Sequence, residues 1–136
     1  MIKKIDHIAV AVPSVDDAAL FYEKQLGLKL ARKEAVPERK VRVGFIPIGE
    51  TQIELVAPDS PDSTIARFLE RRGPGLHHIC FEVDDTGAEL KRLAAAGVRL
   101  IDQAPRTGAH GNKVGFVHPE AAGGVLIELT QPPEKR

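Results

Sequence analysis

Two histidines and two glutamates recur at matching places in this chain of 136 residues. His7 and His78 each lie in an apolar, strand-like run, and Glu54 and Glu128 each lie between apolar residues near the end of another. The histidines are 71 residues apart (78 − 7) and the glutamates 74 (128 − 54), so the two halves are in register apart from a short insertion. Two imidazoles and two carboxylates form an N2O2 donor set suited to a divalent cation. These residues therefore predict a metal site.

A structural alternative exists for each histidine taken alone, because a single histidine at the start of a strand can be a hydrogen-bonded core residue. Folding favours an apolar residue at such a place and has no use for a buried charge. The recurrence of both the histidine and the glutamate in the second half therefore favours the metal.

The elements that must position these residues form the same module twice. The first half predicts a strand over 5–12, a helix capped by Ser14, and strands over 28–33, 41–47 and 51–56. The second half predicts a strand over 76–83, a helix capped near 84–85, and strands over 98–102, 113–118 and 125–130. A short helix capped at 62–63 connects the halves.

We therefore expect one α+β domain over 1–136, with a βαβββ module over 1–58, a helical connector over 59–75 and a second βαβββ module over 76–132. Side chains alternate across a strand, so His7 and Glu54 point away from their apolar neighbours and share a face. Pairing of the two modules about a pseudo-twofold axis would form a curved sheet around a metal-binding cup. That cup is the expected active site.

The composition excludes several partners. Nineteen basic and nineteen acidic residues cancel, and no basic run alternates with aromatic residues, so nothing points to nucleic acid or to an anionic membrane. Cys80 is the only cysteine and lies in an apolar run, which excludes a disulfide within the chain and suits a reducing compartment. The sequence has no signal-peptide pattern and no apolar stretch near the roughly 20 residues of a membrane span. We expect a soluble, cytoplasmic protein.

At the level of whole motifs the sequence resembles the vicinal oxygen chelate superfamily, also called the glyoxalase superfamily, and within it the methylmalonyl-CoA epimerases. The resemblance covers essentially the whole chain. It rests on residues 5–8, 51–55, 62–69 and 75–79, and most specifically on Gly108-Ala109-His110-Gly111, Phe116-Val117-His118-Pro119 and the run 124–129.

The resemblance implies a set of site residues. The metal ligands would be His7, Glu54, His78 and Glu128, and water or substrate oxygens would complete an octahedral shell. Such a shell fits Co²⁺ first, with Mn²⁺, Ni²⁺, Zn²⁺ or Mg²⁺ as alternatives. The substrate would contact the loop residues Gly108, His110 and Gly111.

The resemblance also implies a reaction, the interconversion of (2R)- and (2S)-methylmalonyl-CoA by proton transfer at C2 through a metal-stabilised enolate. Two bases are needed, and Glu54 and Glu128 are the candidates because they come from different modules. A homodimer that binds a small acyl-CoA molecule and serves propionyl-CoA metabolism would follow. Some epimerases carry a further glutamate where this chain has Val43, so the base on that side stays open, with Glu38 a nearby but less favoured carboxylate.

Three other functions remain to be weighed. A glyoxalase I-type lactoylglutathione lyase uses the same four ligands, but its relatives tend to have Asp-Pro-Asp-Gly before the last strand, where this chain has a different run over 118–124. A ring-cleaving dioxygenase needs two histidines and one carboxylate with open positions, so a fourth ligand argues against it. A non-enzymatic small-molecule-binding protein would need aromatic walls, and this chain has no Trp, one Tyr and five Phe.

Overall fold

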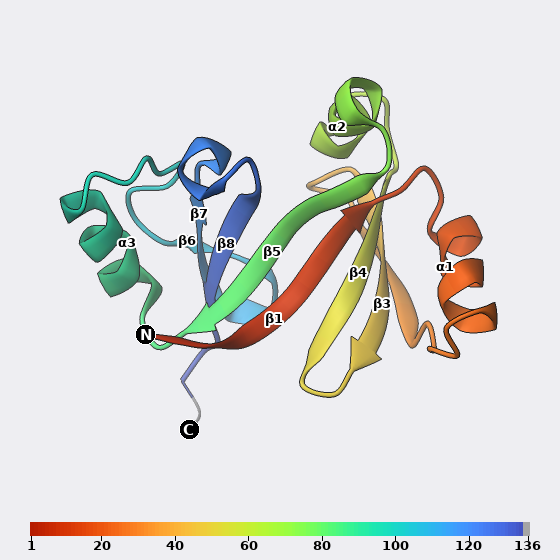
Figure 1. The fold of residues 1–136 in the computed structure, drawn as a ribbon, viewed down its shortest axis with the longest axis horizontal. Coiled ribbons are helices and arrows are strands. Elements are labelled where there is room, and N and C mark those ends of the chain that lie inside the picture. The colour runs from red at the N-terminus through yellow and green to blue at the C-terminus, as the bar shows by residue number, and fades with distance from the viewer. Residues whose placement is uncertain (135–136) are drawn as a thin grey trace. The chain divides into compact units, whose positions relative to one another are not determined.

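The computed structural model describes residues 1–134, which form strands, three α-helices and two short 3₁₀ segments (Figure 1). In chain order these elements are β1 Ile2–Ala11, α1 Val15–Lys24, β2 Arg32–Val36, β3 Val41–Ile48, β4 Thr51–Pro58, α2 Thr64–Arg72, β5 Gly75–Val83, α3 Thr86–Ala95, β6 Arg106–Thr107, η1 Ala109–Gly111, β7 Lys113–Val117, η2 Pro119–Ala122 and β8 Leu126–Gln131. Within this described part, no helix is long and apolar enough to cross a membrane.

The strands follow the order β2-β3-β4-β1-β5-β8-β7-β6. β1 pairs with β4 in parallel, and β5 pairs with β8 in parallel. The pairs β2–β3, β3–β4, β6–β7 and β7–β8 are antiparallel. Each half of the chain thus joins its first strand to its last in parallel, which is the pattern that the repeated sequence predicts.

The chain divides into two compact units. One, here called the His7 unit, is formed by His7–His77; the other, the His78 unit, is formed by Met1–Asp6 and the residues from His78 onward. The division falls inside β1 and β5, so each of these strands contributes residues to both units.

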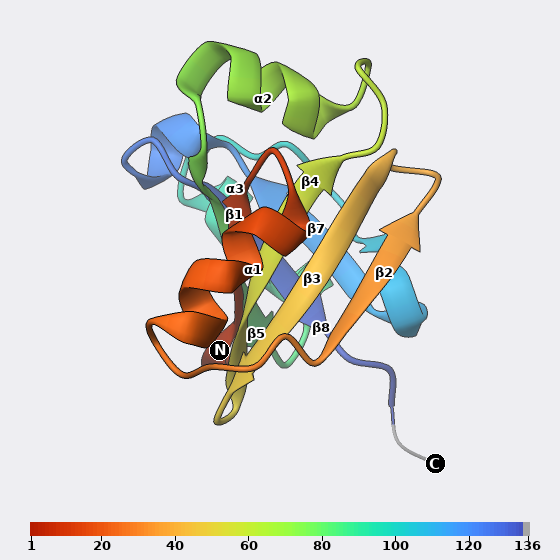
Figure 2. The same ribbon diagram turned by 90° about the vertical axis from the view of Figure 1, so that its right-hand side faces the viewer.

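In the His7 unit, helices cover both faces of the sheet (Figures 1 and 2). Ser14 caps α1 by accepting a hydrogen bond from the backbone N–H of Asp17, as predicted. On the α1 face, Val15 packs with Leu55 in a buried cluster, and on the opposite face Ile65 of α2 packs with residues of β1, β3 and β4. Two-sided burial explains why these strands have apolar residues on both faces.

A glycine on the middle strand of each module lets the helix pack closely against the sheet. A Cβ at Gly44 on β3 would lie 2.5 Å from Val15 Cγ1 of α1. A Cβ at Gly115 on β7 would lie 2.7 Å from Leu90 Cδ1 of α3, and Leu90 is fully buried. The two glycines are 71 residues apart (115 − 44), the same interval as the two histidines.

The strand predicted over 28–33 is wrong in its bounds, because β2 is Arg32–Val36. The preceding residues bond to the helix instead of the sheet. The N–H of Leu28 donates to the carbonyl of Tyr22, and the N–H of Leu30 donates to the carboxylate of Glu23. The segment after α1 therefore reaches the sheet at Ala31, whose N–H donates to the carbonyl of Phe45.

The strand predicted over 98–102 is wrong: this segment makes only an isolated bridge between Leu100 and Val117. The N–H groups of Ile101 and Asp102 both donate to the carbonyl of Phe116, and the Asp102 carboxylate accepts the N–H of Phe116 at 2.8 Å. A side chain thus replaces a ladder hydrogen bond, and pairing with β7 resumes only at β6.

Candidate metal centre and active site

In the His7 unit, the sheet register brings His7 and Glu54 together. Ala9 on β1 pairs with Glu54 on the parallel strand β4, and His7 lies two residues before Ala9, so both polar side chains project from the same face. His7 Nδ1 lies 3.2 Å from Glu54 Oε2. Their side chains are only 11% and 15% exposed, so the imidazole and the carboxylate meet at a largely buried position.

The His78 unit repeats this relationship. Cys80 on β5 pairs with Glu128 on the parallel strand β8, and His78 lies two residues before Cys80. His78 Nε2 lies 3.2 Å from Glu128 Oε1, and these side chains are 12% and 9% exposed. Each unit therefore builds one imidazole–carboxylate pair at the same offset between its first and last strands.

The chemistry of each pair fits half of a divalent cation site. Neutral imidazole nitrogen and carboxylate oxygen are common ligands for first-row divalent ions, and both groups here are largely removed from water. In the His7 unit, the side-chain amide of Gln52 donates to Glu54 Oε2 at 3.1 Å. Such a hydrogen bond fixes the orientation of a carboxylate and is typical of support around a ligand.

A phenylalanine on the middle strand lies beside each glutamate. Phe45 pairs with Glu54 across β3 and β4, and Phe116 pairs with Glu128 across β7 and β8. The His78 ring meets Phe116 edge to face, with centroids 6.2 Å apart. The two phenylalanines are also 71 residues apart (116 − 45), so the same repeat that identified the histidines could have identified these aromatic neighbours.

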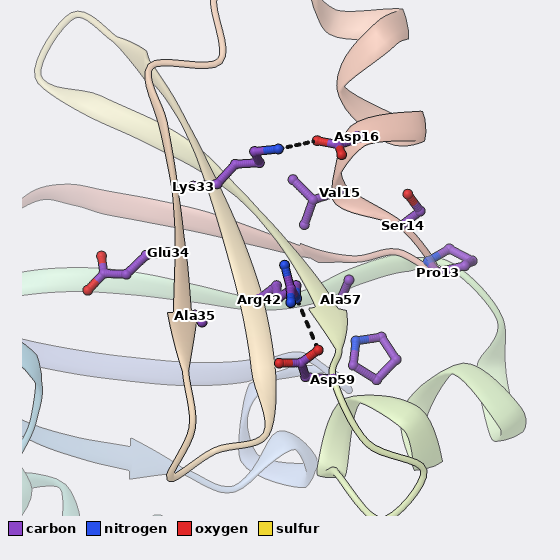
Figure 3. A pocket seen from close by; sticks show the side chains of 11 residues that line it. Pro13, Ser14, Val15, Asp16, Lys33, Glu34, Ala35, Arg42, Ala57 and Asp59 are labelled. Atoms are coloured by element: carbon purple, nitrogen blue, oxygen red, sulfur yellow. Dashed lines mark hydrogen bonds and ion pairs between the residues drawn. The ribbon is translucent and has the colours of Figure 1, made fainter.

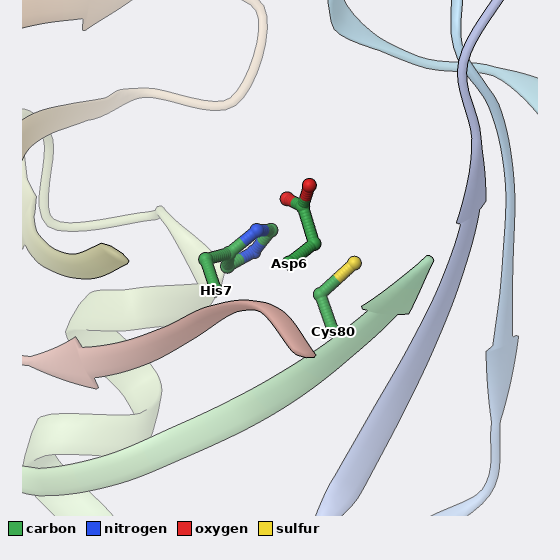
Figure 4. Close-up of side chains that lie close together, drawn as sticks. All are labelled: Asp6, His7 and Cys80. Atoms are coloured by element: carbon green, nitrogen blue, oxygen red, sulfur yellow. The ribbon is translucent and has the colours of Figure 1, made fainter. Parts of the chain in front are cut away.

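Cys80 is fully buried, as expected for a small apolar residue in a strand. Its Sγ lies within 4.8 Å of a carboxylate oxygen of Asp6, which belongs to the same unit (Figure 4). The sequence analysis did not anticipate this thiol–carboxylate neighbour.

The loop with the predicted substrate contacts belongs to the His78 unit. The N–H of Gly108 donates to the carbonyl of Asn112 at 2.7 Å, and a Cβ at Gly108 would lie 2.9 Å from Val114 Cγ1. His110 and Gly111 both have positive φ, 60° and 78°, and both are exposed. Packing against Val114 therefore accounts for Gly108, and the left-handed backbone accounts for Gly111.

A pocket of about 320 Å³ lies elsewhere in the His7 unit, between the start of α1 and strands β2 to β4 (Figure 3). At this pocket Lys33 pairs with Asp16 at 2.9 Å, and Arg42 pairs with Asp59 at 3.0 Å. Ala57 lines it and belongs to the α1 face of the sheet, whereas Glu54 projects from the other face. The pocket is thus separate from the His7–Glu54 pair.

Comparison with known proteins places this geometry in a family. The model of the glyoxalase/bleomycin resistance protein/dioxygenase superfamily matches residues 6–116. The chain belongs to this superfamily, which confirms the predicted fold class.

Similar proteins narrow the class further. An ethylmalonyl-CoA/methylmalonyl-CoA epimerase of Cereibacter sphaeroides is 42% identical over 133 residues, covering 96% of this chain and 99% of the relative. The mitochondrial methylmalonyl-CoA epimerase of Homo sapiens is 41% identical over 129 residues, covering 94% and 73%. The crystal structure of methylmalonyl-CoA epimerase from Mycobacterium tuberculosis has a TM-score of 0.86 at 36% identity and covers 98% of this chain and 90% of that chain. The resemblance to these epimerases is confirmed.

Proposed function

We propose that this protein is a methylmalonyl-CoA epimerase that interconverts the (2R) and (2S) isomers by proton transfer at C2. The observation that carries the proposal is the repeated imidazole–carboxylate pair, which occurs at the same strand offset in both units of a chain about 40% identical to epimerases. A fold that needed only a core would have no reason to keep two such buried polar pairs.

The four side chains His7, Glu54, His78 and Glu128 are proposed to hold one divalent cation, with Co²⁺ the first candidate. The donor types and the burial of each pair support this assignment. When bound, the cation would act as a Lewis acid toward the negative charge that develops on the substrate when the C2 proton leaves.

The chain's own carboxylates would move the proton. Epimerisation removes the proton from one face of C2 and returns it to the opposite face, so it needs two bases. Glu54 and Glu128 are the proposed pair, because each is a carboxylate on the last strand of a different module. Their low exposure excludes most water and favours proton exchange with the substrate.

The loop residues Gly108, His110 and Gly111 are proposed to contact the substrate, since a glycine-containing turn lets backbone N–H groups approach an anionic oxygen closely. We further propose a homodimer in the cytoplasm that serves propionyl-CoA metabolism. The homodimer agrees with the prevalence of cyclic two-subunit assemblies, and a single buried cysteine agrees with a reducing compartment.

The experiment that tests the function compares two substrates on the Co²⁺-loaded protein. Single-isomer methylmalonyl-CoA should become a mixture of isomers, resolved by a stereospecific coupled assay. The hemithioacetal of methylglyoxal and glutathione should give no lactoylglutathione above the rate without protein. The opposite pattern would assign the protein to the lactoylglutathione lyases and overturn the proposal.

A further inference from the structure

An arginine on the edge strand of the His7 unit lies over the aromatic neighbour of Glu54. Arg32 on β2 pairs with Phe45 on β3, and Phe45 pairs with Glu54 on β4, so the three side chains form one row on one face of the sheet. The guanidinium carbon of Arg32 lies 3.9 Å from the centroid of the Phe45 ring. The Arg32 guanidinium also pairs with the carboxylate of Glu34.

The His78 unit contains the same combination. The guanidinium carbon of Arg106 on β6 lies 5.6 Å from the centroid of Phe116, and Phe116 pairs with Glu128. Arg106 Nε is 3.0 Å from the carboxylate of Asp102. Arg32 and Arg106 are 74 residues apart (106 − 32), the interval that also separates Glu54 from Glu128. An exposed arginine beside the catalytic row is therefore a property of the repeat.

Both arginines remain accessible, because the Arg32 side chain is 53% exposed and the Arg106 side chain 60%. An aromatic face and one carboxylate restrict each guanidinium, so less side-chain entropy is lost when a ligand binds. A guanidinium has five N–H donors in a planar fork, which matches the two oxygens of a carboxylate or phosphate. Restricted, accessible and beside the proposed base, each arginine is suited to an anion.

We propose that Arg32 and Arg106 recognise anionic groups of the acyl-CoA substrate, either the free malonyl carboxylate or a CoA phosphate. The proposal rests on the proposed function for the identity of the substrate, and it assigns binding to these residues, not proton transfer. Glu34 partly neutralises Arg32, so it holds the guanidinium in place and competes with the incoming anion.

Lys33 provides a matched control. It is next to Arg32 on β2, carries the same charge and is equally exposed at 55%, but it pairs with Asp16 of α1 on the opposite face of the sheet (Figure 3). The substitutions R32Q and K33Q therefore remove one positive charge from the same strand and differ only in the face affected. General attraction of an anionic substrate would be weakened equally by both.

The test measures KM and kcat for methylmalonyl-CoA in the Co²⁺-loaded protein. R32Q and R106Q should each raise KM about tenfold or more with kcat little changed, because charge-assisted hydrogen bonds are lost. K33Q should leave KM within about twofold of the wild type. E34Q should leave KM unchanged or lower it, since the competing carboxylate is gone.

The signs of these effects separate recognition from structure. If R32Q and E34Q raise KM together, the ion pair is merely structural and the proposal is overturned. An R32Q or R106Q variant that matches K33Q also overturns it.

The source of the anion is distinguished with two partial ligands, CoA and the methylmalonyl N-acetylcysteamine thioester, which carry only the phosphates or only the carboxylate. Calorimetric titration of wild type and R32Q should show weakened binding of the ligand that Arg32 contacts. This binding measurement also separates two failures. A wild type that binds these ligands through Arg32 but does not epimerise methylmalonyl-CoA overturns the function and not the anion site, whereas ligands that bind both proteins equally overturn the anion site.

Discussion

His7 Nδ1 lies 3.2 Å from Glu54 Oε2, across the parallel strands β1 and β4 and two residues out of direct register. His78 and Glu128 repeat this offset between β5 and β8. Parallel pairing of first and last strands is therefore the structural device that converts a sequence interval of 47 residues (54 − 7) or 50 (128 − 78) into a buried imidazole–carboxylate pair.

Removal of either histidine should impair metal binding. With four ligands proposed, His7→Ala should lower Co²⁺ affinity by more than the roughly 10- to 100-fold typical for loss of a residue that only supports a ligand. Equilibrium dialysis followed by elemental analysis would measure this, with one ion per chain expected in the wild type. His110→Gln, at an exposed position, is the control and should retain full occupancy. Full occupancy in His7→Ala would contradict the ligand assignment.

Shortening one base should separate catalysis from metal binding. Glu128→Asp retains a carboxylate but withdraws it by one methylene, so kcat should fall about 10²-fold or more because the proton transfer loses its geometry. Elemental analysis should still find Co²⁺ in the variant. Glu120→Gln removes an exposed carboxylate that pairs with Arg99 at the surface, and it should leave kcat unchanged. If Glu128→Asp keeps both its metal and wild-type kcat, Glu128 is not a base.

The candidate site was predictable because its residues are polar, repeated and set in apolar strands. The same intervals contain Gly44 and Gly115, and Phe45 and Phe116, but glycine and phenylalanine are ordinary in strands and attracted no notice. The errors at 28–33 and 98–102 have a different origin. There the backbone bonds to the carbonyl of Tyr22 or to the side chain of Asp102, and alternation of apolar residues gives no indication of such tertiary partners.

The glycines under the helices should be sensitive to a single methyl group. Gly44→Ala and Gly115→Ala would force the Cβ against Val15 and Leu90, and each should lower the free energy of unfolding by about 1–3 kcal/mol. Urea denaturation followed by circular dichroism would measure this. Gly87→Ala in α3 meets its nearest atom at 3.4 Å, an ordinary contact, and should be neutral or slightly stabilising. Equal stability of all three variants would show that the helices do not rest on these glycines.

Stability should depend on pH through the connector before α2. Hydrogen bonds from Lys40 and then from Ser60 lower the pKa of the Asp62 carboxyl from 3.8 to about 2. Because the folded pKa is the lower one, the stabilising contribution is present above the unfolded pKa and is lost as the pH falls through about 2. Asp62→Asn should therefore lower the urea midpoint slightly at pH 6, and the difference from wild type should close by about pH 2. A difference that persists undiminished at the acid end would contradict this assignment.

The central claim is metal-dependent proton transfer at C2, and deuterium uptake measures it directly. Co²⁺-loaded protein would be incubated with single-isomer methylmalonyl-CoA in D₂O, with and without a chelator, and both the deuterium content at C2 and the stereochemistry would be followed against a sample without protein. The account predicts deuterium at C2 in a mixture of both isomers, and loss of this exchange when the chelator removes the metal. No exchange above the sample without protein, from folded protein with its metal bound, would contradict the account.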